Sequence, residues 1–99
     1  MGIRIQSIHF DATAALESFI QKKVSKLEQF HGEILDADVT LKVIKPETAM
    51  NKEALVKVKV SGSELFASKV SDTFEESVDS AVEALQKQLI KIKEKSRIK

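Results

Sequence analysis

The chain has 99 residues, of which 42% are hydrophobic and 31% are charged, and its formal net charge is +1. These values are typical of one globular domain spanning residues 1–99, and they exclude a disordered chain. The absence of cysteine excludes disulfides and thiolate metal sites. No apolar run approaches the roughly 20 residues that span a bilayer, and the N-terminus does not resemble a signal peptide. We therefore expect a cytoplasmic protein without a membrane partner.

The first segment, residues 3–10, alternates apolar and polar side chains, which predicts a strand. The alternation changes phase between Ile5 and Ile8, which indicates either a bulge or burial of both faces. His9 belongs to this segment, and two histidines without cysteine are too few for a zinc site, so we interpret His9 as a strand residue and expect no metal.

The next segment, residues 14–30, predicts an amphipathic helix that Thr13 or Asp11 caps and Gly32 ends. Phe19 lies between its apolar and basic sides, where it either packs at the rim of the core or stacks on a base. Its apolar residues recur at spacings of three and four: Leu16, Ile20, Val24, Leu27 and Phe30. Its basic residues are Lys22, Lys23 and Lys26.

Three further strands are predicted over residues 38–45, 55–61 and 64–71, where apolar and polar residues alternate. The connection 45–52 contains the only proline. Short connections predict an antiparallel meander, and the helix between the first two strands predicts that these pair in parallel. The expected fold is therefore α+β, in the order β-α-β-β-β-α, with two helices on one face of a four-stranded sheet and the valines beneath them.

The last segment, residues 72–99, predicts one long helix that begins at a capping box formed by Thr73 and Glu76. Acids occupy its first half and bases its second half, which complements the helix dipole. The apolar stripe is Phe74, Val78, Ala81, Val82, Leu85, Leu89 and Ile92. At roughly 100° per residue, the side opposite the stripe carries Lys87, Lys91 and Lys95.

Lysines of the two helices would meet in one basic patch if the helices pack side by side on the sheet. Lysine acts as a point charge that contacts phosphates without reading bases, and the chain has no tyrosine or tryptophan for stacking. This pattern favours recognition of a folded RNA by shape and phosphate spacing. The other interpretation is a solvated helix face whose charges match the dipole.

No pattern of a catalytic site is present. Phosphate-binding loops need several glycines at set spacings, and the chain has three glycines in total. The two histidines belong to no nucleophile–base motif, and Glu75 and Glu76 have a structural reason to stand at a helix start. We therefore expect a non-enzymatic protein with no cofactor and no small-molecule substrate.

Four stretches resemble the ribosome hibernation-promoting factor and ribosome-associated inhibitor family: KKVSKLEQF (22–30), LKV (41–43), VSGSELFAS (60–68) and DTFEESVDSAVEALQKQLIKIKEK (72–95). Their order and spacing extend the resemblance from the first strand to Lys95. It implies a fold similar to double-stranded RNA-binding domains. It also implies a protein that binds the small ribosomal subunit in starvation or stationary phase, covers the transfer-RNA and messenger-RNA sites and silences translation. Longer members have an extra C-terminal domain, so the chain looks like a short form, expected to be monomeric when free.

The resemblance also assigns individual residues. The family often has tyrosine at Phe74, and it usually has a basic residue at Ala84, so one phosphate contact is expected to be missing there. The lysines that match the family's RNA-binding residues are Lys23, Lys26, Lys87, Lys91, Lys93 and Lys95.

Two other functions fit the same residues. A sheet edge or the acidic start of the last helix, at Asp72, Glu75, Glu76 and Asp79, could dock a protein partner. A general binder of double-stranded RNA would use the same lysines.

Overall fold

The computed structural model describes residues 2–8, 10–29, 34–44, 50–60 and 62–97, with the side chains of the last helix as far as Ile92. The elements follow the order β1 (Gly2–Ile8), α1 (Ala14–Ser25), the 3-10 helix η1 (Lys26–Gln29), β2 (Ile34–Val43), β3 (Lys52–Val60), β4 (Ser63–Ser71) and α2 (Phe74–Arg97). This order confirms the predicted β-α-β-β-β-α arrangement.

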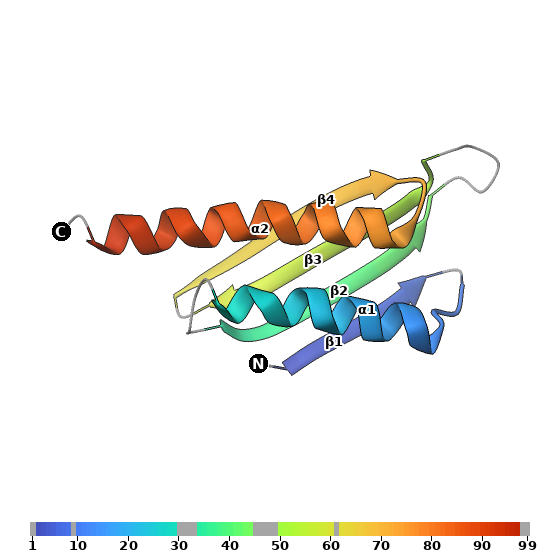
Figure 1. Ribbon diagram of the computed structural model, residues 1–99, viewed down its shortest axis with the longest axis horizontal. Coiled ribbons are helices and arrows are strands. Elements are labelled where there is room, and N and C mark those ends of the chain that lie inside the picture. The colour runs from blue at the N-terminus through green and yellow to red at the C-terminus, as the bar shows by residue number, and fades with distance from the viewer. Residues whose placement is uncertain (1, 9, 30–33, 45–49, 61, 98–99) are drawn as a thin grey trace.

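The four strands form one sheet in the order β1-β2-β3-β4. β1 runs parallel to β2, whereas β2, β3 and β4 pair antiparallel, as predicted. Both helices lie on the same face of the sheet and run side by side in the same direction, and the C-terminal part of α2 extends beyond the end of α1 (Figure 1). We refer to the opposite side of the sheet as the open face.

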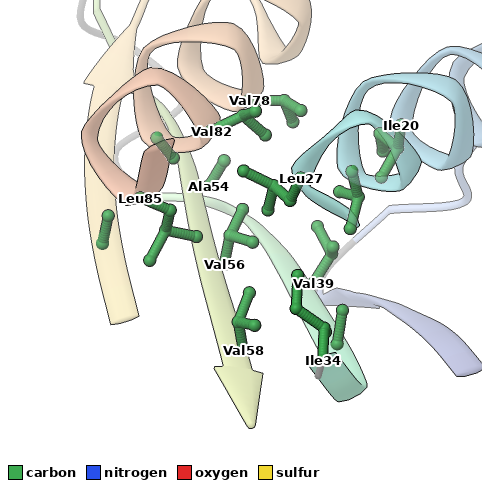
Figure 2. Packing of buried hydrophobic residues seen from close by; sticks show 14 of the residues in the cluster. Ile20, Leu27, Ile34, Val39, Ala54, Val56, Val58, Val78, Val82 and Leu85 are labelled. Carbon is green, nitrogen blue, oxygen red and sulfur yellow. The ribbon is translucent and has the colours of Figure 1, made fainter. Parts of the chain in front are cut away.

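The core lies between the helices and the sheet. Because side chains alternate along a strand, one residue in two points toward the helices, and the β3 residues that do so are fully or almost fully buried: Ala54, Val56, Val58 and Val60. Figure 2 shows Val78, Val82 and Leu85 of α2 and Ile20 and Leu27 of the first helical segment above these strands. The predicted stripe of α2 is therefore the buried side of that helix.

Both helices begin at the residues that the sequence indicates. The Thr13 hydroxyl accepts a hydrogen bond from the Leu16 amide at 3.1 Å, which selects Thr13 over Asp11 as the cap of α1. The Thr73 hydroxyl accepts from the Glu76 amide, also at 3.1 Å. Such caps satisfy amides that have no partner within the helix.

The first helix differs from its prediction because its α-helical part ends at Ser25, five residues before Phe30. Residues Lys26–Gln29 tighten into η1. At three residues per turn, Val24 and Leu27 stay on one face, and both are completely buried. The change of helix type therefore preserves the apolar stripe that suggested a single helix. Gly32 and Phe30 lie outside the described residues.

Strand limits also differ from their predictions. β2 begins at Ile34, four residues earlier than expected, and its register with β3 shifts between Ile34 and Asp36. This irregularity leaves Leu35 exposed and interrupts the alternation that would have indicated a strand. β3 likewise begins earlier, at Lys52. Lys45 and Ser61, the predicted ends of these two strands, lie outside the described residues.

The phase change in the first strand arises because its isoleucines point to both faces of the sheet. The register of β1 with β2 is unbroken from Gly2 to Ile8, so there is no bulge along this pairing. Ile5 faces the core, whereas Ile8 pairs with Lys42 on the open face. Phe10 follows the end of β1 and stacks on Phe74 with 4.6 Å between ring centroids. Phe74 thus keeps the expected packing role without a hydroxyl.

The start of α2 is joined to the strands beside it. The Ser77 hydroxyl donates to the Lys52 carbonyl oxygen of β3, and Asp72 accepts from the Met50 amide at 2.8 Å. These bonds hold the N-terminal turn of α2 against the β3 end of the sheet. In the described part of the chain, no helix combines the length and the apolar character needed to cross a membrane.

Candidate nucleic-acid interface

A hollow of about 490 Å³ lies between the first helical segment and α2. Lys23 of α1 and Lys26 of η1 line one side, and Lys87 of α2 lines the other. The exposed Ile90 gives the hollow an apolar part. We call this hollow the interhelical groove. It brings together lysines from both predicted sets, although they are about 60 positions apart in the sequence.

Lys23 is the most constrained of these lysines. Its ammonium lies 2.9 Å from a carboxylate oxygen of Asp79, and the Lys23 side chain is 31% exposed. The same ammonium lies 5.7 Å from the centre of the Phe19 ring, a distance at which a cation is attracted to the ring face. Phe19 itself packs partly buried against the core, as one of its two interpretations predicted. Lys23 therefore joins α1 to α2 and lines the groove as well.

Acids reduce the positive charge of the groove. Glu83 lies one turn before Lys87, and the two charged groups are 3.9 Å apart. With Lys23, Lys26 and Lys87 against Asp79 and Glu83, the charged residues that line the groove sum to +1. A phosphate entering the groove competes with these two carboxylates. Both ion pairs are partly or largely exposed, and such pairs contribute at most about 1 kcal/mol, so they can be displaced.

The other predicted lysines differ in their position relative to the groove. Lys22 is exposed on α1 but does not line the groove. Lys91 is exposed on α2, one helical turn beyond Lys87. Lys93 and Lys95 belong to the same helix, and their side chains are outside the described part. The structure thus gathers three of the predicted lysines around one hollow, and the RNA-binding roles of all seven remain predictions.

Sequence reasoning missed Lys69 of β4, which lies on the helix side. It pairs in register with the buried Ala54 of β3, so it points toward the helix layer at the outermost strand. The signal was present in the alternation: Lys69 follows Ala67 and Leu65 at spacings of two, and both of those residues contact the core.

On the open face, acidic and basic side chains lie next to each other on neighbouring strands. Along one row of paired residues, Arg4, Asp38 and Lys57 are cross-strand neighbours, and the Arg4 and Asp38 side chains are 3.3 Å apart. Lys57 also lies 3.4 Å from Glu64. Exposed apolar side chains accompany these charges, and Phe66 is 65% exposed.

Two of the acids proposed for protein docking have partners within the chain. Asp72 accepts the Met50 amide, and Asp79 pairs with Lys23. These contacts give the acidic start of α2 a structural role.

Among the described residues, no three side chains of histidine, cysteine, aspartate or glutamate gather as a metal site. Both histidines, His9 and His31, are outside this part of the chain.

Comparison with known sequences identifies similar proteins over almost the whole chain. The sequence model described as "Sigma 54 modulation protein / S30EA ribosomal protein" matches residues 3–97. The ribosome hibernation promoting factor of Klebsiella oxytoca is 32% identical over 95 residues, which cover 96% of each chain. The factor of Escherichia coli K12 is 30% identical with the same coverage. That of Azotobacter vinelandii is 30% identical, and the match covers 96% of this chain and 85% of the relative.

Solved structures share the fold. A ribosomal subunit interface protein from Coxiella burnetii superposes with a TM-score of 0.83 at 27% identity, covering 94% of this chain and 98% of that one. The N-terminal domain of Protein Y from Thermus thermophilus superposes with a TM-score of 0.80, covering 93% and 99%. The Protein Y domain is only 21% identical to this chain, so its similarity shows the fold alone.

Proposed function

Because this chain belongs to the sigma 54 modulation protein and S30EA ribosomal protein family, we propose that it binds ribosomes and holds them in an inactive state. The relatives named ribosome hibernation promoting factor support this function, and they confirm the family to which the sequence motifs pointed. The proposed partner is the small ribosomal subunit with its RNA. The proposed action is occlusion of the decoding region, where transfer RNA and messenger RNA bind, under starvation or in stationary phase.

The observation that carries the proposal is the interhelical groove. Lysines from two separate helical segments border one concave surface, and a concave basic surface suits a ridge of RNA backbone better than a flat one does. The exposed Lys91 extends the positive charge along α2. Lysine ammonium groups bind phosphates by charge, so the proposed recognition depends on the spacing of phosphates in folded RNA.

The proposed mechanism involves binding alone. Residues 1–99 are proposed to act as one non-enzymatic unit that is monomeric when free and works in the cytoplasm. Binding releases counterions from the RNA, and log affinity falls with log salt by about 0.7–0.9 per phosphate contact. Three to five contacts would give a slope of about 2 to 4.5.

Co-sedimentation with purified ribosomal subunits tests the proposal. The protein is expected to pellet with the small subunit at low salt, to be released at high salt, and to be displaced by transfer RNA bound in the decoding region. A pull-down that is insensitive to ribonuclease would indicate a protein partner. Equal affinity for any RNA duplex would indicate a general double-stranded RNA binder. A protein that stays in the supernatant at low salt would contradict the proposed function.

A further inference from the structure

A second hollow, of about 360 Å³, lies on the other side of α2 from the interhelical groove. Lys69 of β4 lines it from the sheet, and Ser80, Ala84 and Lys87 line it from α2. The room exists because Ser80 and Ala84 are small. We call this hollow the β4 pocket.

Two basic groups reach the β4 pocket from different elements. Lys69 is exposed, and it emerges on the helix side of the sheet because its strand position pairs with the buried Ala54. β4 is an outermost strand of the sheet, so the long Lys69 side chain can cover apolar surface with its stem while the ammonium stays in water. Gln88 donates to the Phe66 carbonyl oxygen at 3.3 Å and joins α2 to β4 beside this pocket.

The β4 pocket is continuous with the proposed RNA-binding surface. Lys87 and Glu83 line both hollows, so they stand on the ridge of α2 between them. Basic residues therefore extend across the molecule in the order Lys26, Lys87 and Lys69, from η1 over α2 to β4.

Glu83 is the one acid of the β4 pocket. Its carboxylate is 3.9 Å from the Lys87 ammonium, and both side chains are more than 60% exposed. An exposed pair of this kind contributes less than about 1 kcal/mol, so Glu83 can turn to solvent when an anion approaches Lys87. Two lysines then face the pocket without an opposing charge.

We propose that the β4 pocket binds a backbone phosphate of the RNA and that Lys69 and Lys87 hold this phosphate. Lys69 and Lys87 approach the phosphate from β4 and from α2, on either side of the small Ala84. This inference rests on the proposed function, because it assigns a further contact to the same ribosome-binding surface.

A charge-relocation experiment tests the pocket. Binding of full-length Lys69→Ala to purified small subunits is measured over a series of salt concentrations. The expected result is a slope lower by about 0.7–0.9 and an affinity about sixfold weaker at 0.1 M salt, the contribution of one phosphate contact. Adding Ala84→Lys, which places an ammonium in the same pocket, is expected to restore both quantities. The matched control is Lys59→Ala on the open face, which is expected to change neither.

The outcomes separate this inference from the proposed function. If Lys69→Ala keeps the wild-type slope while Lys87→Ala lowers it, the β4 pocket binds no phosphate and the ribosome-binding function stands. If Ala84→Lys fails to restore binding in a variant with wild-type urea unfolding, Lys69 does not act in this pocket. If the wild-type protein does not bind the small subunit at all, the proposed function and this inference both fail.

Discussion

The two faces of the sheet arrange their charged residues differently. On the open face, bases alternate with acids along rows of paired strands, and Arg4, Asp38 and Lys57 are an example. On the helix side, lysines from α1, η1, α2 and β4 surround two hollows. The open face also has a hollow, of about 350 Å³. There Arg4 and Lys57 both lie beside Asp38 in one row of paired strands, whereas the lysines of the helix side approach two hollows from separate elements.

This difference shows why a count of lysines does not locate a binding site. With a net charge of +1 for the whole chain, an anion is attracted only where the fold separates bases from acids. The open face satisfies its charges within the sheet, where opposite charges on facing positions contribute about 0.2–1 kcal/mol. Lysines are exposed on both sides, but those of the open face pair in register with an acid: Lys42 with Glu53, Lys57 with Asp38 and Lys59 with Asp36.

The largest expected difference between the faces concerns packing. Leu85 of α2 is fully buried, and Leu85→Ala is expected to lower the free energy of unfolding by about 2–5 kcal/mol, because the substitution removes apolar contacts and leaves a cavity. Leu55 lies on the open face, half-buried. Leu55→Ala is expected to cost less than half as much. Urea unfolding of both variants at unchanged m-value measures the difference, and equal losses would show that the open face is packed as well.

A smaller effect separates the two ends of α2. Thr73→Ala removes the hydroxyl that accepts the Glu76 amide and is expected to cost about 1 kcal/mol of stability. Ribosome binding at a temperature where the variant is folded is expected to stay unchanged, because the start of α2 has a structural role. Thr73→Ser keeps the hydroxyl and serves as the control. Loss of binding by a folded Thr73→Ala protein would favour a docking role for this end.

The smallest expected effect is a gain of affinity. Glu83→Gln removes an acid that lines both hollows, and it is expected to strengthen binding to the small subunit about two- to fivefold, which corresponds to about 0.4–1 kcal/mol. Glu64→Gln on the open face is the matched control and is expected to have no effect. Equal or weaker binding by Glu83→Gln would mean that phosphates do not enter the hollows.

Much of the fold could be predicted because local signals agree with the packing. The threonine caps, the stripe of α2 and the alternating valines of β3 all follow from residue type and period. The predictions failed where two conformations share one pattern. The spacing of Val24 and Leu27 fits an α-helix and a 3-10 turn alike, and the irregular register after Ile34 removed the alternation that indicates a strand.

Three of the predicted lysines line the interhelical groove, but the sequence did not predict the shape of the groove. Outward-facing lysines can be read from helical periodicity, and Lys26 and Lys87 were found in this way. Their meeting across one hollow depends on the relative placement of two helices, which the sequence does not encode locally. Lys23 forms an ion pair with Asp79, and Lys69 and Ala84 line the same pocket. In both cases the residues come from different elements of the chain. Both became visible only with the tertiary structure.

A matched pair of charge reversals tests the central claim most directly. Lys87→Glu with Lys91→Glu reverses two charges on the helix side, and Lys42→Glu with Lys59→Glu reverses two on the open face. Binding to the small subunit is measured for both proteins after urea unfolding has shown that each is folded. The helix-side variant is expected to bind at least about 30-fold more weakly at 0.1 M salt, the loss of two phosphate contacts, whereas the open-face variant binds like the wild type. Undiminished binding by the helix-side variant, or an equal loss in both, would contradict a ribosome-binding surface built on the helices.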